Sequence, residues 1–228
     1  AIIWMDVIQG GMLIGGGLIC IVLLLFAIGT PFSAGDILQT AWNATTNVGP
    51  YEVSKIGIGP FEWDLVETTF LVMVLNGFFY ALQKYGTDQT IVQRYLTAKD
   101  DKSAKKAAFI GVFLSVPIWT IFMFVGSLLF AYYQLSPDAA IEGMKADAVF
   151  PHFISTQLPI GVRGLIIAAI AAAAISSLDS DLNCLSAIAV EDYLMRFKKN
   201  VSDKFRLNFG RLVVVLAGLG AVGIAVLY

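Results

Sequence analysis

Residues 171–184 read AAAAISSLDSDLNC and lie inside a long apolar run that begins near Ile160. The alanines at the start of this segment are small enough for another helix backbone to approach closely within a membrane. Side chains that carry oxygen atoms follow them. Four positions share one face of a helix, because they are three or four residues apart: Ala173, Ser176, Ser177 and Ser180. The segment therefore predicts a membrane helix that carries a row of oxygen atoms.

This row of hydroxyl groups, with the carboxylate of Asp179 beside it, is costly in an apolar setting unless a partner offsets the cost. A hard cation such as sodium would do so, because hard cations prefer oxygen ligands. The alternative is that Ser176 and Ser180 donate hydrogen bonds to carbonyls of their own helix, and that Asp179 is protonated or paired. Both interpretations fit the residues.

The composition indicates the class of protein. Of the 228 residues, 57% are hydrophobic and 14% are charged, which is typical of a membrane protein and not of a soluble domain. The net charge of −2 indicates no nucleic-acid partner. The sequence contains no metal triad, nucleophile–base pair or phosphate-binding loop, so we do not expect an enzyme. Cys20 and Cys184 lie in apolar runs and should be core residues, whereas His152 lies in a polar connector, where we expect a surface role.

Five apolar stretches are expected to cross the membrane, since each is near or above the ~20 residues that a crossing needs. They cover about residues 2–28, 65–92, 107–133, 160–195 and 212–228. The second is interrupted by polar residues, among them Asn76, Gln83, Lys84 and the GTDQ run at 86–89, which is typical of a discontinuous helix that lines a cavity. The alternative is an ordinary helix with one polar stripe. Because residues 1–228 lack an initiator Met and end within an apolar run, we expect a single transmembrane domain that is a piece of a longer protein.

The connectors alternate in charge. Residues 94–106 and 196–211 are rich in lysine and arginine, whereas residues 29–64 and 134–159 carry more acidic than basic side chains. The positive-inside rule therefore places the two basic connectors in the cytoplasm and the two acidic connectors outside.

With this topology, Ser176 and Asp6 fall in the same half of the membrane. Ser176 is 16 residues past Ile160, or about 24 Å along a helix at ~1.5 Å per residue. In a hydrocarbon core about 30 Å thick, it lies in the cytoplasmic half. Asp6 stands at the cytoplasmic start of the first span, where it is either an interfacial charge or a functional group. One oxygen site could therefore draw on both spans.

Three segments resemble signatures of the sodium:solute symporter family, which includes sodium–glucose and sialic acid cotransporters. Residues 4–9, WMDVIQ, resemble the family's aromatic-Thr-Asp-x-x-Gln motif, with Met in place of the usual Thr. Residues 87–94, TDQTIVQR, resemble its (Thr/Val)-(Asp/Asn)-Gln-x-x-x-Gln-Arg signature. Residues 175–183, ISSLDSDLN, followed by EDY at 191–193, resemble its Ser-Ser-x-x-Ser signature. The three segments occur in the family's order and spread over most of the chain.

The resemblance implies the fold of the whole molecule. It implies an all-α membrane protein with the inverted-repeat, leucine-transporter-like fold of two five-helix repeats. This chain would hold core helices five to nine, and the missing helices of the same transporter would complete its binding sites.

The resemblance also implies two sodium sites. The main site would use the backbone carbonyl of Ala173 and the hydroxyl groups of Ser176 and Ser177. A second site, which some members of the family have, would use four side chains: Asp6, Ser176, Asp179 and Ser180. Asp179 stands where members with this second site commonly have Ser.

For the solute, the resemblance points to the residues just before the TDQ segment. Lys84 and Tyr85 stand where glucose and galactose carriers have an aromatic pair, and Gln83 and Asn76 lie on the same interrupted helix. A lysine near the cavity would suit an anionic solute such as a sialic acid or another carboxylate. The alternative is that Lys84 faces another helix or pairs with Asp88, four residues further on.

In function, the resemblance implies a symporter that couples sodium to the import of a small organic solute by alternating access. We expect a multi-pass protein of the plasma membrane, which is the inner membrane in bacteria, in contact with the lipid bilayer. A rival function is a membrane sensor domain attached to a signalling kinase, since some sensor kinases carry a domain of this family. A channel is disfavoured, because an interrupted helix and a buried oxygen site suit a binding step better than a continuous pore.

Overall fold

The computed structural model describes residues 2–26, 31–57, 59–198 and 200–227. Within these ranges the chain is helical apart from one short antiparallel hairpin. The elements are α1 (Ile2–Leu25), α2 (Ala34–Asn43), β1 (Thr45–Val48), β2 (Tyr51–Ser54), α3 (Phe70–Gly86), α4 (Gln89–Leu96), α5 (Asp101–Leu135), η1 (Ala139–Ile141), α6 (Ala146–Gln157), α7 (Ile160–Ile188), η2 (Ala189–Leu194), α8 (Met195–Phe197) and α9 (Asp203–Leu227).

Among the described residues, four helical segments are long and apolar enough to cross a membrane. They are Asp6–Leu25 in α1, Asp101–Leu135, Ile160–Phe197 and Asp203–Leu227. Most of their large apolar side chains are exposed in this chain. Apolar surface of this extent requires lipid or further helices to cover it. The chain is therefore an all-helical, multi-pass membrane protein.

The second expected span consists of two helices. α3 has 17 residues, which span about 25 Å, and α4 has 8. Thr87 and Asp88 separate them, so the polar interruption does break the helix, as the sequence indicates. α3 begins at Phe70 and not near residue 65. Before it, the Asp64 carboxylate accepts a hydrogen bond from the backbone N–H two residues further on (2.8 Å), and the Thr69 hydroxyl donates to the Asp64 carbonyl (2.8 Å). Such local side-chain bonds compete with helix formation.

Two other helices begin earlier than the apolar pattern alone indicates. α5 begins at Asp101, because the Asp100 side chain caps its first turn and accepts a hydrogen bond from the Ser103 N–H (2.7 Å). α9 begins at Asp203 and so includes much of the second basic connector. A helix start is set by its cap, and a polar first turn can precede the apolar stretch.

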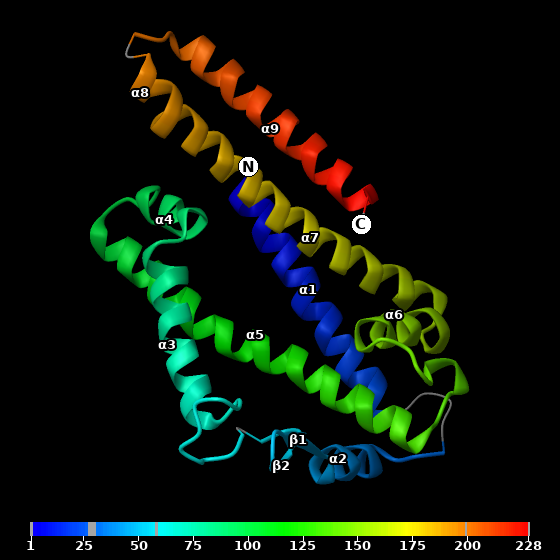
Figure 1. Ribbon diagram of the computed structural model, residues 1–228. Coiled ribbons are helices and arrows are strands. Elements are labelled where there is room, and N and C mark those ends of the chain that lie inside the picture. The colour runs from blue at the N-terminus through cyan, green and yellow to red at the C-terminus, as the bar shows by residue number, and fades with distance from the viewer. Residues whose placement is uncertain (1, 27–30, 58, 199, 228) are drawn as a thin grey trace.

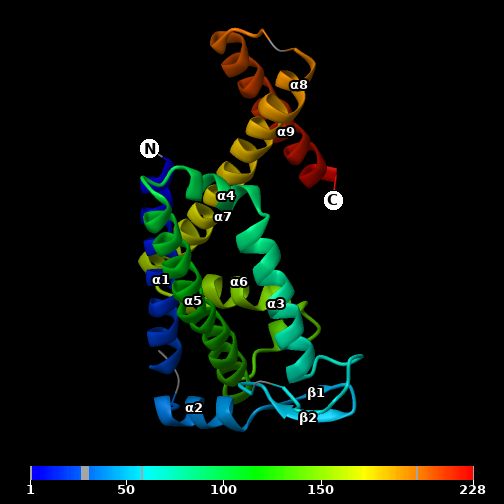
Figure 2. The same cartoon turned by 90° about the vertical axis from the view of Figure 1, so that its left-hand side faces the viewer.

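α1 lies between α5 and α7 (Figure 1) and packs against both of them. α9 returns along α7, and Gly210 allows a close approach there, since a Cβ atom on it would lie 2.7 Å from the Ser186 hydroxyl oxygen. Figure 2 shows α8 and the start of α9 projecting beyond the α1–α5 pair.

The two kinds of connector lie at opposite ends of α1. We call the end that holds the start of α1, α4 and α8 the basic end, and the end that holds α2, the β-hairpin and α6 the acidic end (Figures 1 and 2). This arrangement agrees with the alternation of charge along the chain. Which end faces the cytoplasm remains a prediction from the positive-inside rule.

The buried core lies at the acidic end. Leu24 of α1, Ile37 of α2 and Leu128 of α5 are fully buried there, together with Phe153 of α6. Tyr132 packs edge-on against Phe153, with ring centroids 5.5 Å apart. Burying a side chain of this size stabilises the fold by about 1.5–3 kcal/mol. Cys20 is part of the same core, and Cys184 is buried elsewhere on α7. Both are buried free thiols.

Candidate functional site

Asp6 lies at the basic end of α1, where that helix meets α7 and α4. Its side chain is 18% exposed. The Ser176 hydroxyl donates a 2.6 Å hydrogen bond to Asp6 Oδ1, and Arg94 Nη2 lies 3.0 Å from Asp6 Oδ2. Each carboxylate oxygen therefore has a donor from a different helix. A carboxylate in an apolar helix requires such partners.

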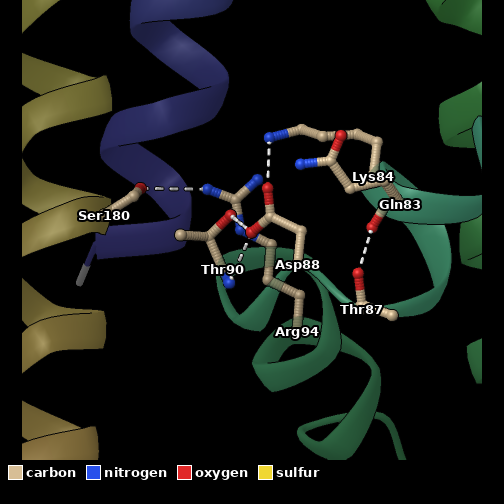
Figure 3. Close-up of polar contacts among 7 residues, drawn as sticks. All are labelled: Gln83, Lys84, Thr87, Asp88, Thr90, Arg94 and Ser180. Carbon is tan, nitrogen blue, oxygen red and sulfur yellow. Dashed lines mark hydrogen bonds and ion pairs between the residues drawn. The ribbon is translucent and has the colours of Figure 1, made fainter. Parts of the chain in front are cut away.

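Arg94 also reaches α7. Its Nη2 donates to the Ser180 hydroxyl at 3.2 Å, and Figure 3 shows the guanidinium group extending from α4 toward that side chain. Ser176 and Ser180 are one turn apart on α7, which is the spacing that the sequence places on one face. The result is a polar cluster of four residues from three helices: Asp6, Arg94, Ser176 and Ser180.

The position of Arg94 depends on how α4 begins. Asp88 is the N-cap of α4, and its Oδ1 accepts hydrogen bonds from the backbone N–H and the hydroxyl of Thr90, at 2.9 and 2.5 Å. Its other oxygen, Oδ2, lies 2.6 Å from Lys84 Nζ on α3 (Figure 3). Asp88 thus connects the end of α3 to the first turn of α4. Capping of this kind fixes the direction in which a short helix leaves the break.

The residues predicted for the main sodium site are close together on α7, but they differ in exposure. Ala173 and Ser176 are partly buried, whereas Ser177 is exposed. The Ser176 hydroxyl donates its hydrogen to Asp6, which leaves its lone pairs free to accept a cation, because a hydroxyl group has one donor and two acceptor sites. An exposed Ser177 suits a site whose remaining ligands come from other helices.

The residues predicted for the second sodium site are brought together in part. Asp6, Ser176 and Ser180 meet in the polar cluster. Asp179 is exposed, and it makes no hydrogen bond or ion pair with any residue in the described ranges. On a helix, Asp179 points about 60° away from Ser176 and about 100° away from Ser180, so it flanks the cluster.

The kind of ion that the cluster could hold follows from its donor atoms. The described residues contain no group of three or more His, Cys, Asp or Glu side chains that could hold a metal ion. Hydroxyl and carbonyl oxygens with a single carboxylate are hard, weakly charged ligands. Such a set fits a monovalent hard cation better than a transition metal or a tightly bound divalent ion.

The residues predicted to bind the solute all lie on α3. Lys84 pairs with Asp88, which is the alternative that the sequence leaves open, and its side chain is 39% exposed. Asn76 and Gln83 are exposed and two turns apart, so they share a face of the helix, whereas Tyr85 is partly buried. The backbone carbonyl of Gln83 accepts a 2.9 Å hydrogen bond from the Thr87 hydroxyl at the end of α3. α3 therefore presents polar side chains on an uncovered surface.

Arg94 is the member of the cluster that the sequence did not place. It ends the TDQTIVQR segment and belongs to a basic connector, so the sequence marks it as part of a family signature and as a topology signal, without a partner. A signal was available: a carboxylate within an apolar span requires an opposite charge, and Arg94 is the first arginine at the predicted cytoplasmic side of the break. The rotation of α4 about its axis was not predictable from the sequence.

Comparison with known proteins identifies the family. The family model described as "Sodium:solute symporter family" matches residues 1–228, the whole chain. The chain belongs to the sodium:solute symporter family. The three motifs therefore indicate the family correctly.

Several curated sodium-coupled transporters are similar to the chain. It is 33% identical to the sodium/sialic acid symporter NanT of Aliivibrio fischeri over 218 residues, which cover 96% of this chain and 41% of that protein. It is 32% identical over 219 residues to the sodium/sialic acid symporter SiaT of Proteus mirabilis, covering 96% and 42%. The mouse sodium-coupled monocarboxylate transporter 1 is 27% identical over 234 residues. The chain spans about two fifths of the length of the first two relatives.

Proposed function

We propose that this chain is part of a sodium-coupled symporter that imports a small anionic solute by alternating access. Membership of the sodium:solute symporter family supports sodium coupling. The observation that carries the proposal is the contact between Asp6 of α1 and Ser176 of α7, because it brings a carboxylate to the hydroxyl row predicted to bind sodium. Two helices whose contact includes the ligands of an ion can change their packing when that ion binds or leaves.

Two sodium ions are part of the proposal. The main site would use the Ala173 carbonyl with Ser176 and Ser177, and the second would use Asp6, Ser176 and Ser180 with Asp179 at its edge. The remaining ligands would come from helices outside this chain. The fold would be the inverted repeat of two five-helix units, with this chain supplying core helices five to nine in a plasma membrane.

The solute would be an anionic sugar such as a sialic acid. Two relatives that are about one third identical are named sodium/sialic acid symporters, and a third is named a monocarboxylate transporter. Lys84 offers a cation on the exposed part of α3, with Asn76, Gln83 and Tyr85 as further contacts. A carboxylate on the solute could exchange with Asp88 as the partner of Lys84.

The test is uptake by the full-length protein in proteoliposomes. An inward sodium gradient should drive accumulation of sialic acid, whereas an equal potassium gradient should not. Neutral hexoses at the same concentration should be carried poorly. If accumulation needs no sodium, or if glucose is preferred to every carboxylated sugar, this proposal is wrong.

Asp6→Asn tests the second sodium ion. In the unmutated protein, uptake should rise more steeply than first order with sodium. The variant should bring the Hill coefficient toward one while the main site still drives uptake. Uptake against sodium at several pH values separates this account from one in which a proton is the second coupling ion. A Hill coefficient of one in the unmutated protein would contradict a second sodium ion.

A further inference from the structure

The guanidinium group of Arg94 uses oxygen atoms that the second sodium ion would need. One nitrogen, Nη2, lies 3.0 Å from Asp6 Oδ2 and 3.2 Å from the Ser180 hydroxyl oxygen. The Ser176 hydroxyl, a third proposed ligand, donates a 2.6 Å hydrogen bond to the other carboxylate oxygen, Asp6 Oδ1. Three proposed sodium ligands, Asp6, Ser176 and Ser180, are therefore already engaged with Arg94 or with one another.

Arg94 and a sodium ion cannot both hold these oxygens in the same way. A guanidinium group has only donors and remains charged at any pH at which proteins fold, so it occupies the lone pairs that a cation would use. Two positive charges within a few ångströms of Asp6 would also repel each other. The Ser180 hydroxyl, which receives the hydrogen bond from Arg94, would have to redirect its lone pairs toward the ion.

We propose that Arg94 is the internal counter-ion of the second sodium site, and that sodium binds there by displacing its guanidinium group from Asp6 and Ser180. This inference rests on the proposed second sodium site. In the sodium-free carrier Arg94 neutralises Asp6, and in the loaded carrier sodium does so. The Asp6 carboxylate is then never left unpaired during the transport cycle. An unpaired carboxylate would be costly in an apolar setting.

The structure makes such an exchange feasible. The Arg94 side chain is 50% exposed, whereas the Asp6 side chain is 18% exposed. The described helices therefore leave the guanidinium group free to move away from Asp6 without opening the packed core, which lies at the other end of α1. α4 itself stays anchored, because Asp88 caps its first turn through the backbone N–H and the hydroxyl of Thr90. The moving part would be one long side chain, which changes rotamer in nanoseconds or less when exposed.

The exchange also predicts a weakened sodium affinity at this site. Displacing Arg94 breaks a half-exposed ion pair and one hydrogen bond to Ser180. Together these should lower the affinity of the site for sodium by about 5- to 30-fold. A low affinity favours release of the ion on the side where sodium is scarce.

The test is sodium-dependent thermal unfolding of the purified full-length protein, with choline replacing sodium. Arg94→Gln should lower the unfolding midpoint in choline, because Asp6 loses its partner. The same variant should reach half of its sodium-induced stabilisation at about 5- to 30-fold less sodium. Arg94→Lys, which keeps a charge but loses the fork, should shift in the same direction by less, and it provides the test if the Gln variant does not fold. Arg211→Gln, an exposed arginine of α9, is the matched control and should do neither.

Two results would overturn the inference, and they differ in whether the proposed second sodium site is also ruled out. If Asp6→Asn weakens the sodium response but Arg94→Gln leaves the sodium requirement unchanged or raises it, Arg94 is a structural clamp and the second sodium site stands. If Asp6→Asn has no effect on the sodium response, the second site and the competition both fail, while the main site can remain. In the Asp6→Asn/Arg94→Gln double variant, the gain in apparent sodium affinity should disappear.

Discussion

At the acidic end of α1, Leu24 and Cys20 are sealed among apolar side chains of α2, α5 and α6. At the basic end of the same helix, Asp6 accepts hydrogen bonds from Arg94 of α4 and Ser176 of α7, which are themselves exposed or partly exposed. One end holds its neighbours by buried area, which is insensitive to ions and strong in total. The other end holds its neighbours by a few charged and polar contacts, which an ion or a solute can replace. A transporter that alternates its access needs one part that stays packed and another that rearranges.

Leu24→Ala should give the largest effect and test the packed end. Leu24 is fully buried, so its truncation should leave a cavity and lower the free energy of unfolding by about 2–5 kcal/mol. Denaturant or thermal unfolding of the full-length protein in detergent measures this. In the protein that remains folded, the sodium concentration for half-maximal uptake should not change. A changed sodium requirement would show that the two ends are not independent.

Ser177→Ala tests the basic end and should have the opposite effect: it should change the sodium requirement and leave the stability nearly unchanged. Removing one neutral oxygen from the proposed main sodium site should cost about 1–3 kcal/mol of binding energy, the range for a lost buried polar partner. Because Ser177 is exposed in this chain, the stability of the sodium-free protein should change little. Uptake and sodium-dependent unfolding both report the sodium half-saturation. If this value stays at the unmutated level with normal expression, the assignment of Ser177 is wrong.

Lys84→Gln tests the basic end more closely, because Lys84 could bind the solute or could only pair with Asp88. If Lys84 contacts an anionic solute, its loss should cost roughly 0.5–1.5 kcal/mol of solute binding energy. The solute half-saturation should then rise, while the sodium half-saturation stays nearly unchanged. If it only pairs with Asp88, the sole effect should be the ~0.3–0.5 kcal/mol of an exposed helical ion pair. Competition assays with sialic acid and with a neutral sugar distinguish the two. Equal half-saturations in variant and parent would remove Lys84 from the solute site.

The basic end was predictable in part. The packed end was not, because α2 and α6, which complete its core, lie in the two acidic connectors, for which the sequence predicted no helix. The run of alanines and serines on α7 predicts its helix and the face that Asp6 approaches, because spacing fixes which side chains share a face. The break between α3 and α4 was predictable from the polar TDQ segment. Contacts that depend on the rotation of a short helix, such as Arg94 with Asp6, were not. That rotation is set by the Asp88 cap and by packing between residues 88 positions apart.

Helix starts also escaped prediction for a local reason. Asp64 and Thr69 hold the chain out of α3 by bonds to the backbone, whereas the Asp100 cap lets α5 include five polar residues ahead of its apolar stretch. Similar side chains thus delay the start of one helix and advance the start of another. His152, expected at the surface, lies in hydrogen-bond reach of Asp138 (3.0 Å), a contact between segments that no short-range pattern shows.

Asp138→Asn should have the smallest effect and concerns the connector that closes the packed end. The hydrogen bond from His152, with a second one from the Ala140 backbone N–H, holds the pKa of the Asp138 carboxyl below its ordinary value. The folded state therefore favours the charged form. The resulting stabilisation is fully present above the ordinary pKa of an aspartate, about 3.9, and is lost as the pH falls through the lowered value. Asp138→Asn should thus lower the unfolding midpoint slightly at pH 7 and make the midpoint fall less steeply between pH 5 and pH 3 than in the parent. Glu142→Gln, which removes one charge from the same connector but keeps the His152 contact, controls for net charge. An identical acid dependence in parent and Asp138→Asn would mean that this pair does not stabilise the acidic end, and that the buried side chains around Leu24 hold it without help from the connector.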